Sequence, residues 1–205
     1  MSAPLWSPDE LVGGDPALDL TNTAGGAGKA RDRERLTAYA EAIAWARAAG
    51  VLDRADAAVL ADRAEASPED ASAALVRLRD FRESLHATLA AVALDDPSAR
   101  SLAAVRSVVQ EAVGRADLVR ADGAFAWTVG REGSGLDLIR DRAALAAQRL
   151  LTGPDLARVR QCERCSWLFL DRGRGRGRRW CSMAACGNRA KAQRHYHRHR
   201  PRPDG

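Results

Sequence analysis

The chain has 205 residues, of which 46% are hydrophobic, and its 32 basic and 27 acidic side chains give a net charge of +5. This length accommodates one domain with a sizeable core and a small module that need not bury much surface of its own. No apolar stretch approaches the length of a membrane span, and no repeat at a solenoid period is visible, so neither a helical membrane protein nor a repeat protein is expected.

The N-terminal residues 1–20 carry four acidic side chains and lack both the basic and the apolar region of a secretory signal. We therefore expect a cytoplasmic protein whose cysteines stay reduced.

Helix start and stop signals divide most of residues 1–153 into predicted helices. Asp15 followed by Pro16 is typical of an N-cap with proline at the first helical position, and predicts a short helix over 17–23. The glycine-bearing stretch 24–29 that follows is predicted to be a flexible linker. Apolar side chains at helical spacing then predict helices over about 35–49, 53–66, 67–92, 96–112 and 136–152.

The periodicity changes after Gly114. Residues 117–121 and 124–129 are predicted as strands of a hairpin, because Asp122-Gly123 between them is favoured in type I′ turns. Gly153-Pro154 ends the last helix and predicts a domain boundary. The expected fold is mainly α: a helical domain with a small β-hairpin over 1–153, then a small cysteine-bearing module over 154–205.

All four cysteines lie in that second module. Cys162 and Cys165 are separated by two residues, and Cys181 and Cys186 by four, with fifteen residues between the pairs. Two short-spaced pairs are the ligand pattern of a closed structural zinc site, so we predict one Zn²⁺ per chain. An iron–sulfur centre and disulfides are the alternatives.

The order of elements around the cysteines predicts a treble-clef-like zinc finger. Residues 159–162 and 167–170 are expected to be short strands, and about 188–199 a helix, so that the second cysteine pair lies at a helix N-terminus. Trp167 and Trp180 are each close to a ligand and are expected to shield the metal. Stacking of one of them on nucleic-acid bases is the alternative.

Charge is divided unevenly along the chain. Residues 158–205 hold fourteen basic and three acidic side chains, a net +11, so the preceding residues carry −6. A small module with this charge can displace counterions from a phosphate backbone, which makes duplex DNA the expected partner. Acidic membrane surfaces would attract the same charge, but the apolar face needed for insertion is missing, and no membrane partner is expected.

Basic side chains in three places are candidates for nucleic-acid contact. Arg189 begins the predicted helix, where recognition helices often meet base edges. The others share one helix face or follow the glycine-rich loop, where they would meet phosphates. They are Lys191, Arg194 and Arg198 on the helix, and Arg172, Arg174, Arg176, Arg178 and Arg179 on the loop. A solvated basic face is the alternative interpretation.

Asp19 and Asn22 are polar side chains in the first predicted helix. They are candidates for lining a ligand pocket in the N-terminal domain, with helix capping or satisfied core polarity as the alternative. No nucleophile–base pairing is readable, and the histidines near the cysteines lie beyond them at the chain's end, so we expect no enzyme.

Two segments resemble known families. Trp180–Met183 and Cys186–Lys191, which contain the tetrapeptide Cys-Gly-Asn-Arg, resemble the CGNR zinc finger. Gly13–Thr23 resembles the start of the ABATE domain that precedes this finger. The resemblance implies a bacterial, stress-induced transcription regulator with zinc on the four cysteines.

We therefore interpret the chain as a sequence-specific DNA-binding regulator whose helical domain binds a small-molecule effector or forms a homodimer. An RNA- or ribosome-associated factor that uses the same basic finger is the alternative.

Overall fold

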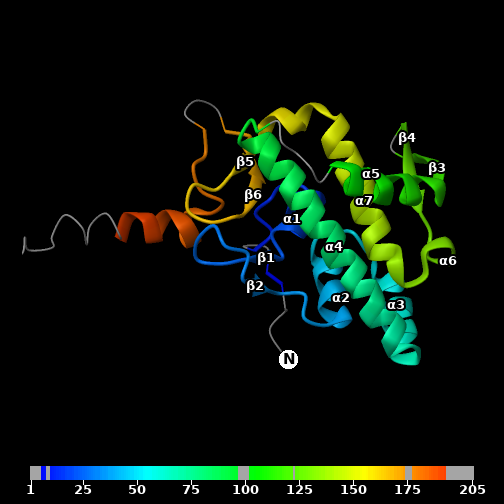
Figure 1. Cartoon of the computed structure of the whole chain (residues 1–205). Coiled ribbons are helices and arrows are strands. Elements are labelled where there is room, and N and C mark those ends of the chain that lie inside the picture. Colours follow the sequence, from blue (N-terminus) through cyan, green and yellow to red (C-terminus); the bar gives the residue numbers. More distant parts are fainter. Residues whose placement is uncertain (1–5, 8–9, 97–101, 122, 174–176, 193–205) are drawn as a thin grey trace, which may run out of the picture.

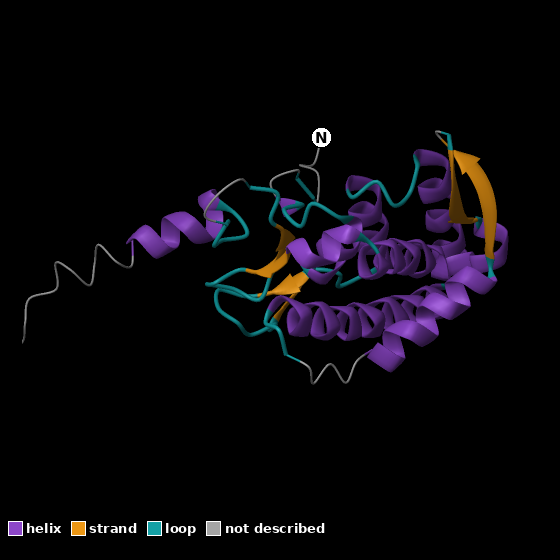
Figure 2. Ribbon diagram, turned by 90° about the horizontal axis from the view of Figure 1, so that it is seen from above, coloured by secondary structure: helices purple, strands orange, loops and turns teal. Residues whose placement is uncertain are grey.

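The computed structural model describes residues 6–7, 10–96, 102–121, 123–173 and 177–192. Across these residues the chain is mainly helical, with three two-stranded antiparallel sheets, which confirms the predicted fold class. The helices pack into one body, with a β-hairpin at one end and the cysteine-bearing segment at the other (Figures 1 and 2). The treble-clef arrangement of that segment stays a prediction.

The elements follow the predicted order. The helices are α1 (Pro16–Thr21), α2 (Tyr39–Ala48), α3 (Arg54–Ala66), α4 (Pro68–Ala93), α5 (Leu102–Gly114), α6 (Arg131–Ser134) and α7 (Leu138–Thr152). Short 3₁₀ turns are η2 (Gly135–Asp137) and η3 (Pro154–Arg158), and a π-helical turn is η4 (Met183–Gly187). The strands are β1 (Ala24–Gly25), β2 (Arg33–Glu34), β3 (Ala116–Ala121), β4 (Ala124–Val129), β5 (Val159–Gln161) and β6 (Leu168–Leu170).

Side-chain caps fix two of the predicted helix starts. An Asp15 carboxylate oxygen accepts the Ala17 N–H at 2.8 Å, and Asp53 accepts the Asp56 N–H at 2.7 Å. These bonds satisfy backbone donors that have no partner inside the helix, which is why aspartate at these positions predicted the starts well.

One predicted helix begins later than expected, and one predicted linker contains a strand. The helix expected from residue 35 begins at Tyr39, because Arg33 and Glu34 pair with Gly25 and Ala24 in a short ribbon. The prediction of a flexible linker over 24–29 is therefore wrong for its first two residues. Two-residue strands carry too little periodicity to be read from sequence.

An ion-pair network attaches the β1–β2 ribbon to α4. The guanidinium of Arg82 is 3% exposed and donates to Glu34 at 2.6 and 2.7 Å and to Glu83 at 2.8 Å. It also donates to the Thr23 hydroxyl at 3.2 Å. A buried guanidinium needs such partners, so the network holds the ribbon in a defined position.

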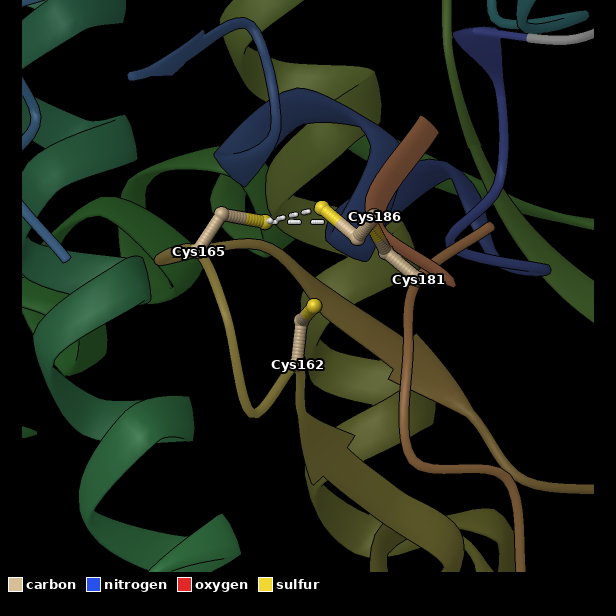
Figure 3. Close-up of side chains that lie close together, drawn as sticks. All are labelled: Cys162, Cys165, Cys181 and Cys186. Carbon is tan, nitrogen blue, oxygen red and sulfur yellow. Dashed lines mark hydrogen bonds between the residues drawn. The ribbon is translucent and has the colours of Figure 1, made fainter. Parts of the chain in front are cut away.

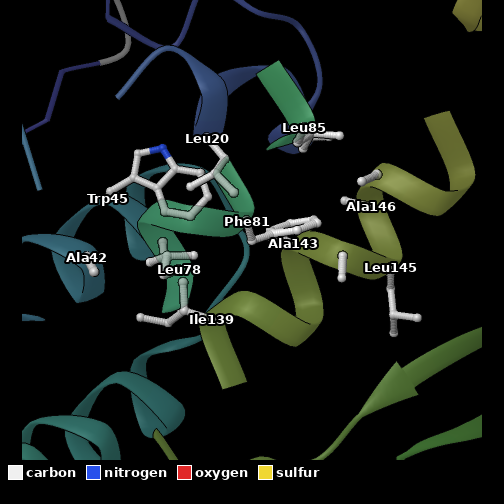
Figure 4. Close-up of a cluster of buried hydrophobic side chains, with 14 of the residues drawn as sticks. Leu20, Ala42, Trp45, Leu78, Phe81, Leu85, Ile139, Ala143, Leu145 and Ala146 are labelled. Atoms are coloured by element: carbon white, nitrogen blue, oxygen red, sulfur yellow. The ribbon is translucent and has the colours of Figure 1, made fainter. Parts of the chain in front are cut away.

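The core lies where α1, α2, α4 and α7 meet. Trp45 from α2, Phe81 from α4 and Ile139 from α7 are buried there, together with Leu20 from α1 (Figure 4). The three- and four-residue spacing that predicted each helix also places these side chains on the inward faces.

The strands of the cysteine-bearing segment share this core. Val159, Leu168 and Leu170 are buried in the same hydrophobic cluster as the helices, and β5 and β6 contact α4 and α1. The boundary between residues 153 and 154 falls between α7 and η3 and stays a prediction. Residues 159–170 nevertheless form part of one packed unit with the helices.

The predicted hairpin is present at the opposite end. β3 and β4 pair antiparallel, with Leu118 opposite Trp127, and Gly123 in the turn has φ +80°. That left-handed conformation is the reason for glycine there.

Candidate metal centre

The first cysteine pair lies in a tight turn between β5 and β6. Cys162 directly follows β5, and its N–H donates to the Trp167 carbonyl at 2.9 Å, which closes the turn around Cys165. The second pair lies around η4, where the Cys186 N–H donates to the Ser182 carbonyl at 3.0 Å. Each pair is therefore held by its own local backbone bond.

The four sulfur atoms point toward one another (Figure 3). All lie within 4.8 Å of one another, and Cys165 Sγ is 3.7 Å from Cys181 Sγ and 3.6 Å from Cys186 Sγ. A tetrahedron with Zn–S bonds of about 2.3 Å has edges of about 3.8 Å. The sulfur cluster thus has the size and the donor chemistry that Zn²⁺ requires.

The surroundings of the sulfurs suit a closed structural site. All four cysteines are buried, and Phe169, Trp167 and Trp180 pack against them. Hydrogen bonds among the thiols lower the pKa of Cys162 and raise the pKa of Cys165 and of Cys181, because the cluster favours one thiolate that accepts from its neighbours. The two tryptophans lie next to the metal ligands, as expected for shielding.

Residues of the N-terminal domain hold the first cysteine turn in place. The Asn22 side chain donates to the Leu168 carbonyl at 2.8 Å and accepts the Leu168 N–H at 2.9 Å. His86 on α4 hydrogen-bonds through Nε2 to the Ser166 carbonyl at 2.8 Å. Burial lowers the pKa of His86 to about 4 and keeps the ring neutral.

Sequence reasoning gave no role to His86 and no strand-pairing role to Asn22. His86 lies on α4 and Asn22 caps the end of α1, and the partner of each is a backbone group far away in the chain. A buried polar residue on an apolar helix face was the available signal, but it does not identify the partner.

Asp19 and Asn22, the candidates for a ligand pocket, are bonded to the protein itself. Asp19 is 7% exposed and accepts the Gly13 N–H at 2.8 Å, and Asn22 is 2% exposed. Neither lines the cavities bordered by Tyr39, Trp127, Trp167 or Leu136. These contacts favour the structural alternative for both residues.

Asp19 gives the protein a pH-dependent stability that can be measured. Burial raises its pKa to about 6, above the ordinary value of about 3.9, so the unfolded chain releases this proton at lower pH than the folded one. Stability contributed by Asp19 should therefore fall as pH rises from about 4 to about 6. We expect Asp19→Asn, which keeps an oxygen for the Gly13 N–H, to be stabilised relative to wild type by a few kcal/mol above pH 6.

Urea unfolding of the two proteins at pH 5, 6 and 7.5 measures the effect, and the gap between them should widen with pH. A gap that stays constant over this range would show that Asp19 does not titrate there.

Comparison with known families agrees with this geometry. Residues 14–154 match the ABATE family, described as "Putative stress-induced transcription regulator", and residues 158–199 match the CGNR zinc finger. The chain belongs to the ABATE family. No curated protein matches it. The finger match and the cysteine cluster together identify a site for one structural zinc ion.

The loop arginines of this ABATE-family protein have partners within the chain. Arg172 donates to Asp155 at 3.3 Å, and Arg178 donates to the Val12 carbonyl at 3.0 Å. Arg179 forms two bonds of 2.6 Å with Glu163. All three arginines are nonetheless exposed, so they remain available to phosphates at their outer faces.

Arg189 and Lys191 lie on the helical residues 188–192, which project from the body of the ABATE-family protein (Figures 1 and 2). Both are exposed. The remaining candidates, Arg174, Arg176, Arg194 and Arg198, lie outside the described residues. None of the described helices combines the length and the apolar character needed to cross a bilayer.

Proposed function

We propose that this protein is a DNA-binding transcription regulator of the bacterial cytoplasm. The segment that holds the zinc site, residues 158–205, would contact duplex DNA. The observation that carries the proposal is the concentration of charge: +11 within residues 158–205, attached to a metal site that fixes the backbone around it. The match of residues 14–154 to a family described as a transcription regulator, followed by a match to a zinc finger, supports it.

The exposed basic side chains have positions suited to two kinds of contact. Arg189 and Lys191 lie on a projecting helix, which can enter a groove, whereas Arg158, Arg160 and Arg172 lie on the body of the segment. Phosphate contacts give affinity without sequence information, and base contacts give specificity. We assign Arg189 to base edges and the others to phosphates.

The N-terminal helical domain then serves for effector binding or for homodimerisation. Regulation requires that a second ligand or subunit change the affinity for DNA. The helices α1 and α4 pack against the strands β5 and β6, so binding to the helical domain can affect the position of the finger.

We also propose that the protein is not an enzyme. His86 is the histidine that the described residues include, and it is buried and bonded to a backbone carbonyl. It is therefore not free to serve as a general base.

A selection from random duplex DNA with the full-length, zinc-loaded protein tests the function, and enrichment of one sequence motif is the expected result. Arg189→Ala should then lose about 1 to 3 kcal/mol of discrimination. Lys191→Ala should weaken binding to all DNA sequences alike. It should also reduce the magnitude of the slope of log K against log salt concentration by about 0.9, because one phosphate contact is lost.

Arg54→Ala is the matched control, because Arg54 is an exposed helix arginine outside the basic segment. Equal effects of Arg189→Ala on every sequence would remove the base-reading role. Stronger binding to structured RNA than to any duplex would replace the DNA proposal with the RNA-associated one.

A further inference from the structure

We propose that a cavity between the β1–β2 ribbon and the zinc site binds a small molecule that carries a phosphate or carboxylate group. The proposal gives a place and a chemical class to the effector, and in that part it rests on the proposed function. The cavity has a volume of about 400 Å³, within the range of small-molecule sites.

The cavity is formed by both family segments. The N-terminal segment supplies the glycine strand and two arginines, Arg33 and Arg35, and the finger supplies Trp167 and Arg189. It therefore lies where a ligand would contact the helical domain and the projecting helix at the same time.

Three of the four charged side chains that line the cavity are arginines, and the fourth is Glu10. Arg35 is paired with Glu10 at 2.6 Å and stacks on Trp6 with its guanidinium carbon 3.7 Å from the ring centre. The side chains of Arg33 and Arg189 form no hydrogen bond or ion pair with any residue that the structure describes, although the Arg33 backbone pairs with Gly25. Two guanidinium groups that line one cavity without a carboxylate partner attract an anion, and cavity walls of low dielectric strengthen that attraction.

The type of cation and the wall of the cavity indicate the ligand class. Arginine presents paired N–H donors that match the two oxygens of a carboxylate or phosphate. Trp167 offers an apolar face beside these donors, and its indole is held close to the ribbon. A Cβ at Gly25 would lie 2.5 Å from Trp167 Nε1, so any other residue at position 25 would clash with the indole.

A competing explanation for the position of these arginines is that they balance the negative charge of the metal site. A zinc ion with four thiolates carries a net negative charge, and Cys165, Cys181 and Cys186 border the same cavity. That explanation requires the arginines to stabilise bound zinc and predicts no site for an external anion.

Binding of two simple anions, inorganic phosphate and succinate, tests the proposal on the full-length, zinc-loaded protein. Resonances of the indole N–H groups report the position: Trp167 should shift in a saturable way, whereas Trp45, buried among α2, α4 and α7, should not. Arg33→Ala should weaken binding about tenfold or more, because it removes a charged hydrogen-bond donor. Arg54→Ala should leave binding unchanged.

Three outcomes would overturn the proposal. The first is the absence of saturable binding of either anion. The second is equal binding by the Arg33→Ala and Arg54→Ala variants. The third is a short DNA duplex that shifts Trp167 with the same Arg33 dependence while neither anion binds, since the cavity would then hold a DNA phosphate. These measurements need no operator, so a failure of DNA binding would leave this test intact.

A competition experiment addresses regulation. Because Arg189 serves both the cavity and the proposed base contact, phosphate should reduce DNA affinity more than chloride at equal ionic strength. This difference between phosphate and chloride should disappear in Arg33→Ala, because that variant lacks one arginine of the cavity but keeps the helical residues 188–192 unchanged. An excess that persists in that variant would place the competing anion elsewhere and overturn the coupling.

Discussion

Cys181→Ser is expected to abolish zinc binding and to remove the ordered structure around the second cysteine pair, whereas β5 and β6 stay packed in the helical core. A serine hydroxyl does not replace the thiolate, and the three remaining sulfurs leave the tetrahedral shell open. Structural zinc contributes roughly 10 to 16 kcal/mol to folding in small modules, which is comparable to the whole net stability of a typical domain.

The helical domain should survive this change. Its core residues, such as Trp45, Phe81 and Ile139, make their contacts within α2, α4 and α7. Far-ultraviolet circular dichroism should retain most of its helical signal, while elemental analysis shows less than one zinc per chain and the indole resonance of Trp180 moves to the position of an exposed tryptophan.

Met183→Ala is the matched control, since Met183 lies in the same turn, is exposed and has no thiolate to offer. It should keep one zinc. A Cys181→Ser protein with full zinc content would contradict the assignment of this ligand, and a coloured protein from anaerobic purification would indicate an iron centre instead.

The parts of the fold that the sequence predicted are those with strong local causes. Asp53, Pro16 and Pro68 mark helix starts because caps and proline act within one turn. The cysteine spacing predicted the metal cluster because each pair chelates from a single turn of backbone. Asp122-Gly123 predicted the hairpin because its glycine adopts a positive φ.

The parts that could not be predicted depend on contacts between distant residues. The β1–β2 ribbon exists because Glu34 is held by Arg82 of α4, and no local pattern encodes that ion pair. The packing of β5 and β6 into the helical core likewise depends on Asn22 and His86, whose partners follow them by 146 and 80 residues. The arginine-lined cavity arises from the same packing, which brings Arg189 next to the ribbon.

Asn22→Ala is expected to destabilise the junction between the helical domain and the finger by about 2 to 6 kcal/mol. The side chain forms both hydrogen bonds that a neighbouring strand would give to Leu168, so its removal leaves one buried N–H and one buried C=O without partners. Each such group costs about 1 to 3 kcal/mol. Only a side chain with both a donor and an acceptor serves here, which explains asparagine rather than aspartate.

Urea unfolding measures the loss, and hydrogen exchange at the Leu168 amide locates it. Exchange should accelerate at Leu168 more than at the Ala143 amide of α7, where intrahelical hydrogen bonds are unaffected. Asn188→Ala is the matched control, because Asn188 is exposed and its replacement should change stability by no more than about 0.5 kcal/mol. An Asn22→Ala protein with wild-type stability and a protected Leu168 amide would show that β6 has another partner on this edge. The expected result would instead show that Asn22 contributes measurably to the junction between the ABATE domain and its zinc finger.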